Sequence, residues 1–356
     1  MRSRCADECD RGPVSRRRTA LRSPRSIVTA VLLIALLGAS AQSIAGSRSS
    51  GTSSRPSPTN LFQVTVEAAG TTDAVGRPAH TVYRPQHLET VPFDMPVVMW
   101  ANGGCRRGNQ EFHYFLTQLA SFGYFVVANG DPNHPFTAAE LHTLLQPDPA
   151  KLISGLDWAL AVNADPQSPY FKRLDGSRVV MMGQSCGGRE AGAASADARV
   201  TTSILWNAQY CGPVEVGPAK TTDIPPRDEC IARLHAPTLW VSGGPGDTTY
   251  ADVQGDYERS RVPSVWADNP SVGHTLLWED DSTAAPVTCC AGGPVHIGGG
   301  YSPSKYQNEP LILSWRWLDF VLYDDLSSRA FFLGQGCGLC ERPGWSAKSK
   351  NWPSAR

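Results

Sequence analysis

The sequence predicts an α/β protein in which a mostly parallel central sheet is covered by helices on both faces. Short apolar runs alternate along the chain with segments whose apolar residues recur at helical spacing, which is the order that a parallel sheet requires. The composition fits a folded domain, because 41% of the 356 residues are hydrophobic and 18% are charged. The 33 glycines and 28 prolines make about 17% of the chain, below the share in structureless or collagen-like proteins. Disorder and fibrous structure are therefore excluded.

The expected elements follow one another from Leu61 onward. Strands are expected at residues 81–83, 96–100, 124–128, 178–182, 203–206, 238–241 and 263–267. Helices are expected at residues 110–122, 151–162, 189–196, 250–261 and 310–323, the last with the clearest amphipathic pattern. No internal repeat and no domain boundary interrupts this order. We therefore expect one domain over residues 61–345, followed by a C-terminal tail over residues 346–356.

The first 41 residues have the pattern of a secretory signal. Residues 1–26 contain eight arginines against three acidic residues, residues 27–38 are an apolar run, and Ala39-Ser40-Ala41 is a typical cleavage pattern. The run is shorter than the roughly 20 residues of a membrane span, although an uncleaved N-terminal anchor is the alternative. Arg17-Arg18 also loosely resembles a twin-arginine signal. Residues 42–60, rich in Ser, Gly, Pro and Thr, are expected to be a flexible linker.

Removal of the signal would leave an acidic, secreted or periplasmic protein. The formal net charge changes from −1 to −6, because the removed segment carries eight positive and three negative charges. An acidic chain without a Lys/Arg cluster lacks the phosphate contacts that dominate nucleic-acid affinity. We expect no nucleic-acid partner and no stable membrane insertion after cleavage. The sequence leaves the oligomeric state open.

Eight cysteines would remain after cleavage, and an even number in an exported chain indicates disulfides. We expect at least two disulfides. One joins Cys211 to Cys230, and Cys337 and Cys340 pair either with each other or with Cys289 and Cys290. Cys105 and Cys186 form either a disulfide or two buried thiols. Because Cys337-x-x-Cys340 has no second pair of ligands nearby, we expect no metal site there.

The segment Gly183-Gln184-Ser185-Cys186-Gly187-Gly188 follows an apolar run and precedes a small-residue helix. In a nucleophile elbow, such a strand–turn–helix arrangement exposes the serine hydroxyl, and the glycines allow the backbone to crowd at the turn. The bare G-x-S-x-G pattern is weak evidence, but here it stands in the context that the mechanism requires. We therefore interpret Ser185 as a nucleophile rather than as an ordinary turn serine.

A serine nucleophile needs a base, and in this arrangement the acid and then the histidine follow the serine in the chain. Asp247 ends a Gly-rich loop after an apolar strand, where a carboxylate can orient an imidazole. Asp252 and Asp256 are the reserve candidates, within an expected helix. His274 follows the last expected strand and is preferred as the base over His296, which lies in a Gly/Pro-rich stretch.

Two backbone N–H groups are needed to stabilise the oxyanion of a tetrahedral intermediate. The N–H of Cys186, directly after the nucleophile, is expected to be one of them. The other is expected from Gly104 or Cys105, in the turn that follows the strand at residues 96–100. The alternative for this turn is a plain connection between a strand and a helix.

Together these residues resemble the α/β-hydrolase superfamily, and within it the exported esterases related to dienelactone hydrolases and cutinase-like polyester hydrolases. The chain is similar to a group with five motifs, all present here: N-G-G-C at 102–105, G-Q-S-C-G-G at 183–188, G-G-P-x-D at 243–247, V-G-H-T at 272–275 and C-x-L-C at 337–340. The resemblance covers about residues 61–345. It implies an α/β-hydrolase fold and a cofactor-free triad of Ser185, His274 and Asp247. Residues 281–304 depart from the pattern as an apparent insertion after His274.

The sequence thus predicts an exported serine hydrolase that cleaves carboxylic esters of small molecules or polymers. The first alternative is a serine peptidase of the same fold, because a triad does not distinguish an ester from an amide. No propeller-like N-terminal region accompanies the domain, which lowers that alternative. The other alternative is a catalytically inactive binding protein, which would lack a triad residue, and none is missing.

Overall fold

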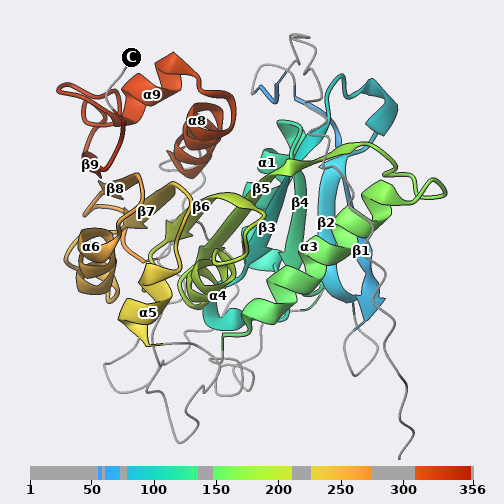
Figure 1. Cartoon of the computed structure of the whole chain (residues 1–356), viewed down its shortest axis with the longest axis horizontal. Helices are drawn as coiled ribbons and strands as arrows, with labels where there is room; N and C mark the ends of the chain where they lie inside the picture. The colour runs from blue at the N-terminus through green and yellow to red at the C-terminus, as the bar shows by residue number, and fades with distance from the viewer. Residues whose placement is uncertain are drawn as a thin grey trace, which may run out of the picture. The chain divides into compact units, whose positions relative to one another are not determined.

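Nine strands form one mostly parallel sheet with helices on both faces (Figure 1). The computed structural model describes residues 55–57, 61–72, 78–132, 134, 147–210, 226–274, 277 and 309–353. The strands are β1 (Val64–Thr72), β2 (Pro78–Pro85), β3 (Met95–Ala101), β4 (Phe125–Asn129), β5 (Leu174–Gln184), β6 (Val200–Trp206), β7 (Thr238–Ser242), β8 (Ser264–Asp268) and β9 (Ser346–Lys350). Their order across the sheet is β1-β2-β4-β3-β5-β6-β7-β8-β9. All pairs from β4 to β8 are parallel, whereas β1–β2, β2–β4 and β8–β9 are antiparallel.

The helices divide between two layers. Helices α3 (Pro149–Ala164), α4 (Cys186–Ala194), α5 (Arg227–Ala232) and α6 (Tyr250–Arg259) contribute apolar residues to one core, and α1 (His113–Ser121), α8 (Glu309–Tyr323) and α9 (Leu326–Phe332) contribute to the other. Short 3₁₀ turns occur at η1 (Leu88–Thr90), η2 (Gly103–Cys105) and η3 (Gln110–Phe112). The central sheet therefore has helices packed on each side, as the alternating sequence pattern predicts.

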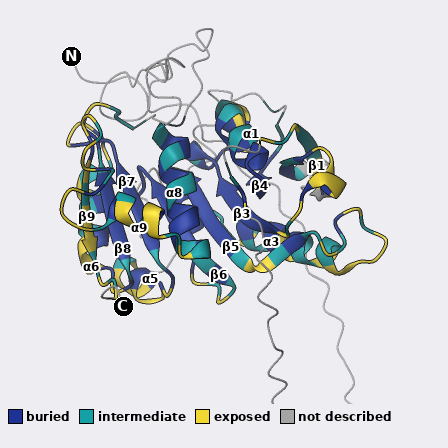
Figure 2. Ribbon diagram, turned by 90° about the horizontal axis from the view of Figure 1, so that it is seen from above, coloured by how far each residue is buried: buried dark blue, intermediate teal, exposed yellow. Residues whose placement is uncertain are grey.

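The central strands are buried on both faces, since alternate residues point into opposite cores. In β3, Val97 and Met99 pack in one core, while Val98 and Trp100 pack in the other, and all four are fully buried. Figure 2 shows these strands as buried and the exposed residues as concentrated on the outer helices and loops. Burial of apolar surface contributes roughly 25 cal/mol per Å², so this double core is the main source of stability.

Every expected strand and helix overlaps an observed one, with shifted ends. β5 begins four residues before the expected start, and α4 begins directly at Cys186 instead of at Arg189. The pattern did not single out β1, α5, α9 or β9. The short helices offer too few residues for a clear period, and β1 and β9 carry polar residues because they lie at the edges of the sheet.

Part of the segment expected as a C-terminal tail, residues 346–356, belongs to the sheet. Residues 346–350 form β9, which pairs with β8 and closes one edge of the sheet. The segment before it is docked as well, because Leu339 is fully buried and Trp345 is buried to 95%. Lys348 extends over the ring of Trp266, and Lys350 extends over the ring of Tyr257. These cation–π contacts help to hold β9 against the sheet, although its sequence is polar.

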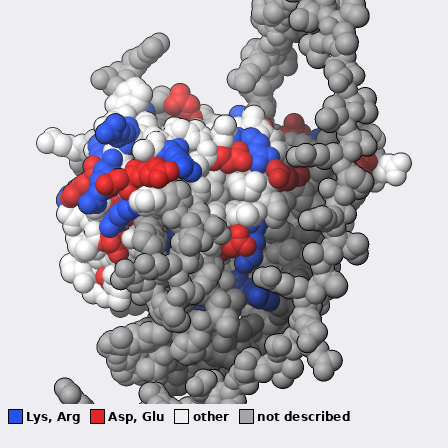
Figure 3. All heavy atoms as spheres, turned by 60° about the horizontal axis from the view of Figure 1, so that its bottom comes forward, with Lys and Arg blue, Asp and Glu red and all other residues white. Residues whose placement is uncertain are grey.

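Part of the expected linker is also attached to the domain. Arg55 forms ion pairs with Asp325 (2.9 Å) and Asp319 (3.8 Å), and Pro56 is buried. The expected signal over residues 1–41 lies outside the described residues. Within the described ranges, no helix has the length and apolar character needed to cross a membrane. On the face in Figure 3, acidic and basic side chains of the described residues intermingle.

Candidate active site

The predicted site residues meet at the carboxyl edge of the parallel strands. β3, β5, β6, β7 and β8 are neighbours in that order, and parallel strands end at the same edge of a sheet. The segments that follow these strands are residues 102–105, Ser185, Asn207, residues 243–247 and residues 269–274, respectively. These segments, together with Cys186 at the start of α4, contain every described candidate for nucleophile, acid, base and oxyanion donor except the two reserve acids on α6.

Ser185 occupies a sharp turn between β5 and α4. Its backbone angles are φ 54° and ψ −121°, a combination that costs a non-glycine residue energy and that clusters at functional sites. The turn is tight because Gly187 packs directly on the end of β3, where an added Cβ would lie 2.2 Å from the carbonyl oxygen of Ala101. This close packing of α4 keeps Ser185 at the top of the sheet, between buried neighbours.

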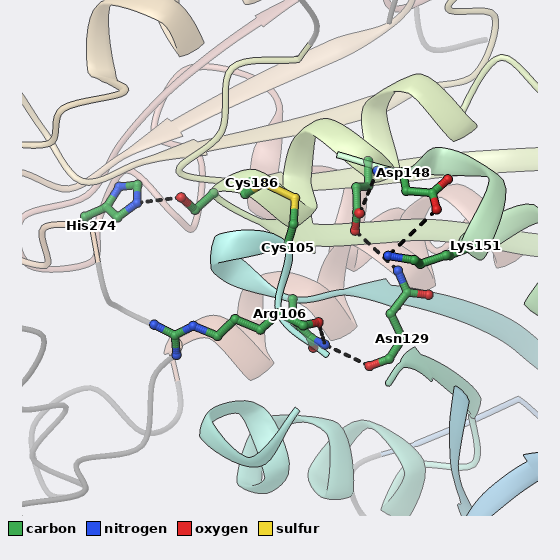
Figure 4. The surroundings of a disulfide bond; sticks show 10 residues. Cys105, Arg106, Asn129, Asp148, Lys151, Cys186 and His274 are labelled. Carbon is green, nitrogen blue, oxygen red and sulfur yellow. Dashed lines mark hydrogen bonds and ion pairs between the residues drawn. A yellow bond between two sulfur atoms is a disulfide. The ribbon is translucent and has the colours of Figure 1, made fainter. Parts of the chain in front are cut away.

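A continuous hydrogen-bond chain joins the three predicted triad residues. The hydroxyl oxygen of Ser185 lies 2.9 Å from Nε2 of His274, and Nδ1 of His274 lies 2.7 Å from Oδ1 of Asp247. Figure 4 shows His274 near Cys186, the residue that follows Ser185, with a dashed line at its imidazole for the hydrogen bond. The histidine side chain is 27% exposed and the aspartate side chain is fully buried. The arrangement allows a proton to pass between the hydroxyl and an imidazole held by a buried carboxylate.

The carboxylate of Asp247 accepts hydrogen bonds from three directions besides His274. Asn207 Nδ2 donates to Oδ2 at 2.7 Å, the N–H and the hydroxyl of Thr249 each donate to Oδ1 at 2.9 Å, and the N–H of Gly243 donates to Oδ2 at 3.3 Å. Burial would raise the pKa of Asp247, but the hydrogen bonds and charge of the His274 imidazole and the other donors outweigh it and hold the pKa well below its usual range. Asp247 is therefore ionised at any working pH.

The reserve candidates do not join this chain. Asp252 and Asp256 both lie on α6 and both pair with Arg227, and Asp256 also accepts a hydrogen bond from the N–H of Tyr210. These contacts connect α6 to α5 and to the segment that follows β6, and they do not reach Ser185 or His274. His296, the alternative base, and the apparent insertion at residues 281–304 lie outside the described residues.

The predicted oxyanion loop is fixed by the fully buried side chain of Asn102. This amide accepts from Trp100 Nε1 (2.9 Å) and donates to the carbonyls of Asn129 (2.8 Å) and Arg106 (3.1 Å). Gly104 and Cys105 follow with left-handed backbone angles, φ 66° and φ 51°. The N–H of Cys105 donates to the carbonyl of Asn102 at 3.1 Å and is engaged within the turn.

A disulfide joins Cys105 to Cys186, which resolves the choice between a disulfide and two buried thiols (Figure 4). It connects the loop after β3 to the first residue of α4, so the two segments that carry the candidate oxyanion donors are linked covalently. Cys337 pairs with Cys340, one of the two expected pairings. Cys230 is also disulfide-bonded, and Cys211, Cys289 and Cys290 lie outside the described residues.

The buried carboxyl group of Glu190 lies on α4, one helical turn after Cys186. Glu190 accepts hydrogen bonds from the N–H of Asp148 (2.8 Å) and from Asn129 Nδ2 (3.3 Å), two residues that Figure 4 labels. Burial raises the pKa of Glu190 to about 7, against the opposing effects of these hydrogen bonds and of Lys151. The folded protein thus holds a proton that the unfolded chain loses above about pH 4.5, and stability falls as the pH rises from there to about 7.

The described residues contain no group of three or more His, Cys, Asp or Glu side chains that could hold a metal ion. No protein-family model and no curated protein matches the chain. Assignments of role therefore depend on the geometry of these residues.

Two residues of the site escaped the sequence analysis, Gln184 and Asn207. Both are fully buried amides that contact the loop of His274: Gln184 Nε2 donates to the carbonyl of His274 (2.8 Å), and Asn207 Nδ2 donates to that of Gly273 (3.1 Å). Gln184 occupies the variable position of the elbow pattern, which carries no signal. Asn207 directly follows an apolar strand that lies in the chain between the strand before Ser185 and the strand before Asp247. This position is the only sign in the sequence that Asn207 belongs to the site.

Proposed function

We propose that this protein is a serine hydrolase of the α/β-hydrolase fold that cleaves carboxylic esters. The observation that carries the proposal is the hydrogen-bond chain from Ser185 through His274 to the buried Asp247, with the serine at a strained strand–helix turn. Serine, acid and histidine follow in the order of that superfamily, at the ends of β5, β7 and β8. A surface histidine or an ordinary turn serine would have no reason to form this chain.

The chemistry proceeds through an acyl-enzyme. The hydroxyl oxygen of Ser185 attacks the carbonyl carbon of the ester while Nε2 of His274 accepts its proton. His274 then gives this proton to the leaving alcohol, and a water molecule attacks the acyl-enzyme with the same assistance. Asp247 holds the imidazole in the required orientation and stabilises the imidazolium that forms.

The oxyanion of each tetrahedral intermediate is assigned to two backbone N–H groups. Cys186 is the first residue of α4, and the N–H groups of a first helical turn have no acceptor within the helix. Of the two expected partners, Gly104 is preferred, since the N–H of Cys105 is engaged with Asn102. Removal of one such donor typically lowers kcat by about 10²–10³-fold.

Export to an oxidising compartment belongs to the same proposal. Disulfides persist in secreted and periplasmic proteins and are rare where thiols are kept reduced. The Cys105–Cys186 and Cys337–Cys340 disulfides support this assignment, together with the N-terminal signal pattern.

The proposal is tested with a fluorophosphonate probe and a panel of p-nitrophenyl esters of increasing acyl length, each matched with the corresponding anilide. We expect the probe to label Ser185, and we expect the esters to be hydrolysed faster than the anilides. Preferential cleavage of anilides would assign the protein to the peptidases instead. Absence of labelling in a protein shown to be folded would refute a catalytic role for the serine.

A further inference from the structure

The loop of His274 has to cross two strand ends to reach Ser185. His274 follows β8, whereas Ser185 follows β5, and β6 and β7 lie between them. With neighbouring strands about 4.8 Å apart, the loop returns over a distance of about 14 Å along the sheet edge. The direct contacts of the imidazole are one hydrogen bond to Ser185 and one to Asp247. Something further has to hold the backbone of the loop in place.

Two amide side chains contact that backbone at consecutive carbonyl groups. Gln184, the last residue of β5, donates to the carbonyl of His274 at 2.8 Å. Asn207, the first residue after β6, donates to the carbonyl of Gly273 at 3.1 Å. β5 and β6 are neighbouring strands with Gln184 opposite Trp206, the residue before Asn207, so the two amides that contact the loop come from adjacent strand ends. Both side chains are fully buried, which strengthens each bond relative to one in water.

The surroundings of each amide are shaped for this contact. Gly103 lies against Gln184, and a Cβ at Gly103 would lie 2.1 Å from Gln184 Oε1, so the glycine makes room for the amide. Asn207 has φ 46°, a left-handed conformation that Asn tolerates better than most residues, and its N–H donates to the carbonyl of Val241. From there the same Nδ2 group reaches both Asp247 and Gly273.

We infer that Gln184 and Asn207 are positioning residues that hold the loop of His274 over the ends of β5 and β6, so that its imidazole faces Ser185. The inference rests on the proposed triad. Gln184 acts through the backbone of His274, and Asn207 acts both through the backbone of Gly273 and through the carboxylate of Asp247. Neither side chain has to touch the substrate. Removal of either one displaces the imidazole, and a displacement of about 1 Å can lower the rate of reaction about 10²-fold.

The test compares Gln184→Met and Asn207→Gly with the wild type. Met has a similar length to Gln without its hydrogen bonds, and Gly tolerates the left-handed backbone at position 207. Asn163→Leu is the matched control, because this amide makes three hydrogen bonds to the backbone of Arg173 and Leu174, at the opposite end of β5 from the site. We expect kcat and the rate of phosphonylation by the fluorophosphonate probe to fall 10- to 100-fold in the first two variants, with KM changed less than about threefold. The control should lose a similar amount of thermal stability and keep wild-type kcat.

A second variant separates positioning from general stability through the pH profile. In Asn207→Asp, the new carboxyl group at position 207 and the carboxyl group of Asp247 are in hydrogen-bond contact and share one proton at low pH. That proton replaces the amide hydrogen that Asn207 donates to Asp247 in the wild type. As the pH rises the proton is lost, so kcat should fall with pH between 5 and 9, unlike kcat of the wild type. The other titratable groups of this loop cluster are His274 and Asp268, and Asp268 accepts hydrogen bonds from Ser242 and from the N–H of Gly244.

The outcomes separate this inference from the proposed function. Slower phosphonylation in Gln184→Met and Asn207→Gly supports the inference even if no ester of the panel is cleaved, in which case only the substrate assignment fails. Wild-type rates of phosphonylation in both variants, or an equal loss in Asn163→Leu, would overturn it while ester hydrolysis by Ser185 stands. A wild-type protein that the probe does not label would overturn both.

Discussion

Removal of the Cys105–Cys186 disulfide should affect both stability and catalysis, and the Cys337–Cys340 disulfide provides an internal comparison. The paired cysteines are 81 residues apart in the first and 3 apart in the second. A disulfide lowers the conformational entropy of the unfolded chain, and by the chain-entropy relation this raises the free energy of unfolding by about 4–5 kcal/mol for the first loop and about 2 kcal/mol for the second. The double variant Cys105→Ala/Cys186→Ala should therefore lose about twice as much stability as Cys337→Ala/Cys340→Ala.

The catalytic effect should be confined to the first disulfide. Substitution of Cys186 keeps its backbone N–H, but the loop with Gly104 is then no longer tied to α4. We expect kcat for a p-nitrophenyl ester to fall about 10- to 100-fold through the misplaced oxyanion donor, with a smaller change in KM. The Cys337→Ala/Cys340→Ala variant should retain kcat within about twofold.

The measurement combines urea unfolding of both variants with ester kinetics at a temperature where each is folded by circular dichroism. Thiol counting on the unfolded, unreduced wild type verifies that the disulfides are formed. Equal losses of unfolding free energy in the two variants would refute the loop-entropy argument. Wild-type kcat in folded Cys105→Ala/Cys186→Ala would refute the role of the disulfide in holding the oxyanion loop.

Three further predictions concern single residues. Ser185→Ala and His274→Ala should each lower kcat by about 10³-fold or more, and the double variant no further, because triad members act as a unit; additive losses would contradict this. Glu190→Gln should remove a decline in unfolding free energy of about 3 kcal/mol between pH 4.5 and 7, measured by urea titration, and an unchanged slope would show that Glu190 is not its source. Gly103→Ala should push the amide of Gln184 away and lower kcat without changing the oligomeric state, and wild-type kcat would exclude that contact as relevant.

Local patterns determine the parts of this fold in which the signal lies in consecutive residues. β3 and β5 to β8 contain continuous apolar runs because helices bury them on both faces, and these runs are visible in the sequence. The position of Ser185 follows for the same reason, since a strand, a tight glycine turn and a helix succeed one another without interruption. The sequence also indicates Asp247 and His274 as site residues, because each lies shortly after a strand and parallel strands end at the same edge of the sheet.

Only the tertiary structure decides which distant residues meet. β9 has the sequence Ser-Ala-Lys-Ser-Lys, and its pairing with β8 depends on the exposed edge of that strand and on the rings of Trp266 and Tyr257. The partner of Cys105 depends on how closely the loop after β3 approaches α4. Gln184 and Asn207 are ordinary polar residues until the loop of His274 lies across them. A hydrogen bond between residues 66 or 90 positions apart leaves no trace in the local pattern of either segment, because its energy depends on the geometry of donor and acceptor in space and not on their separation along the chain.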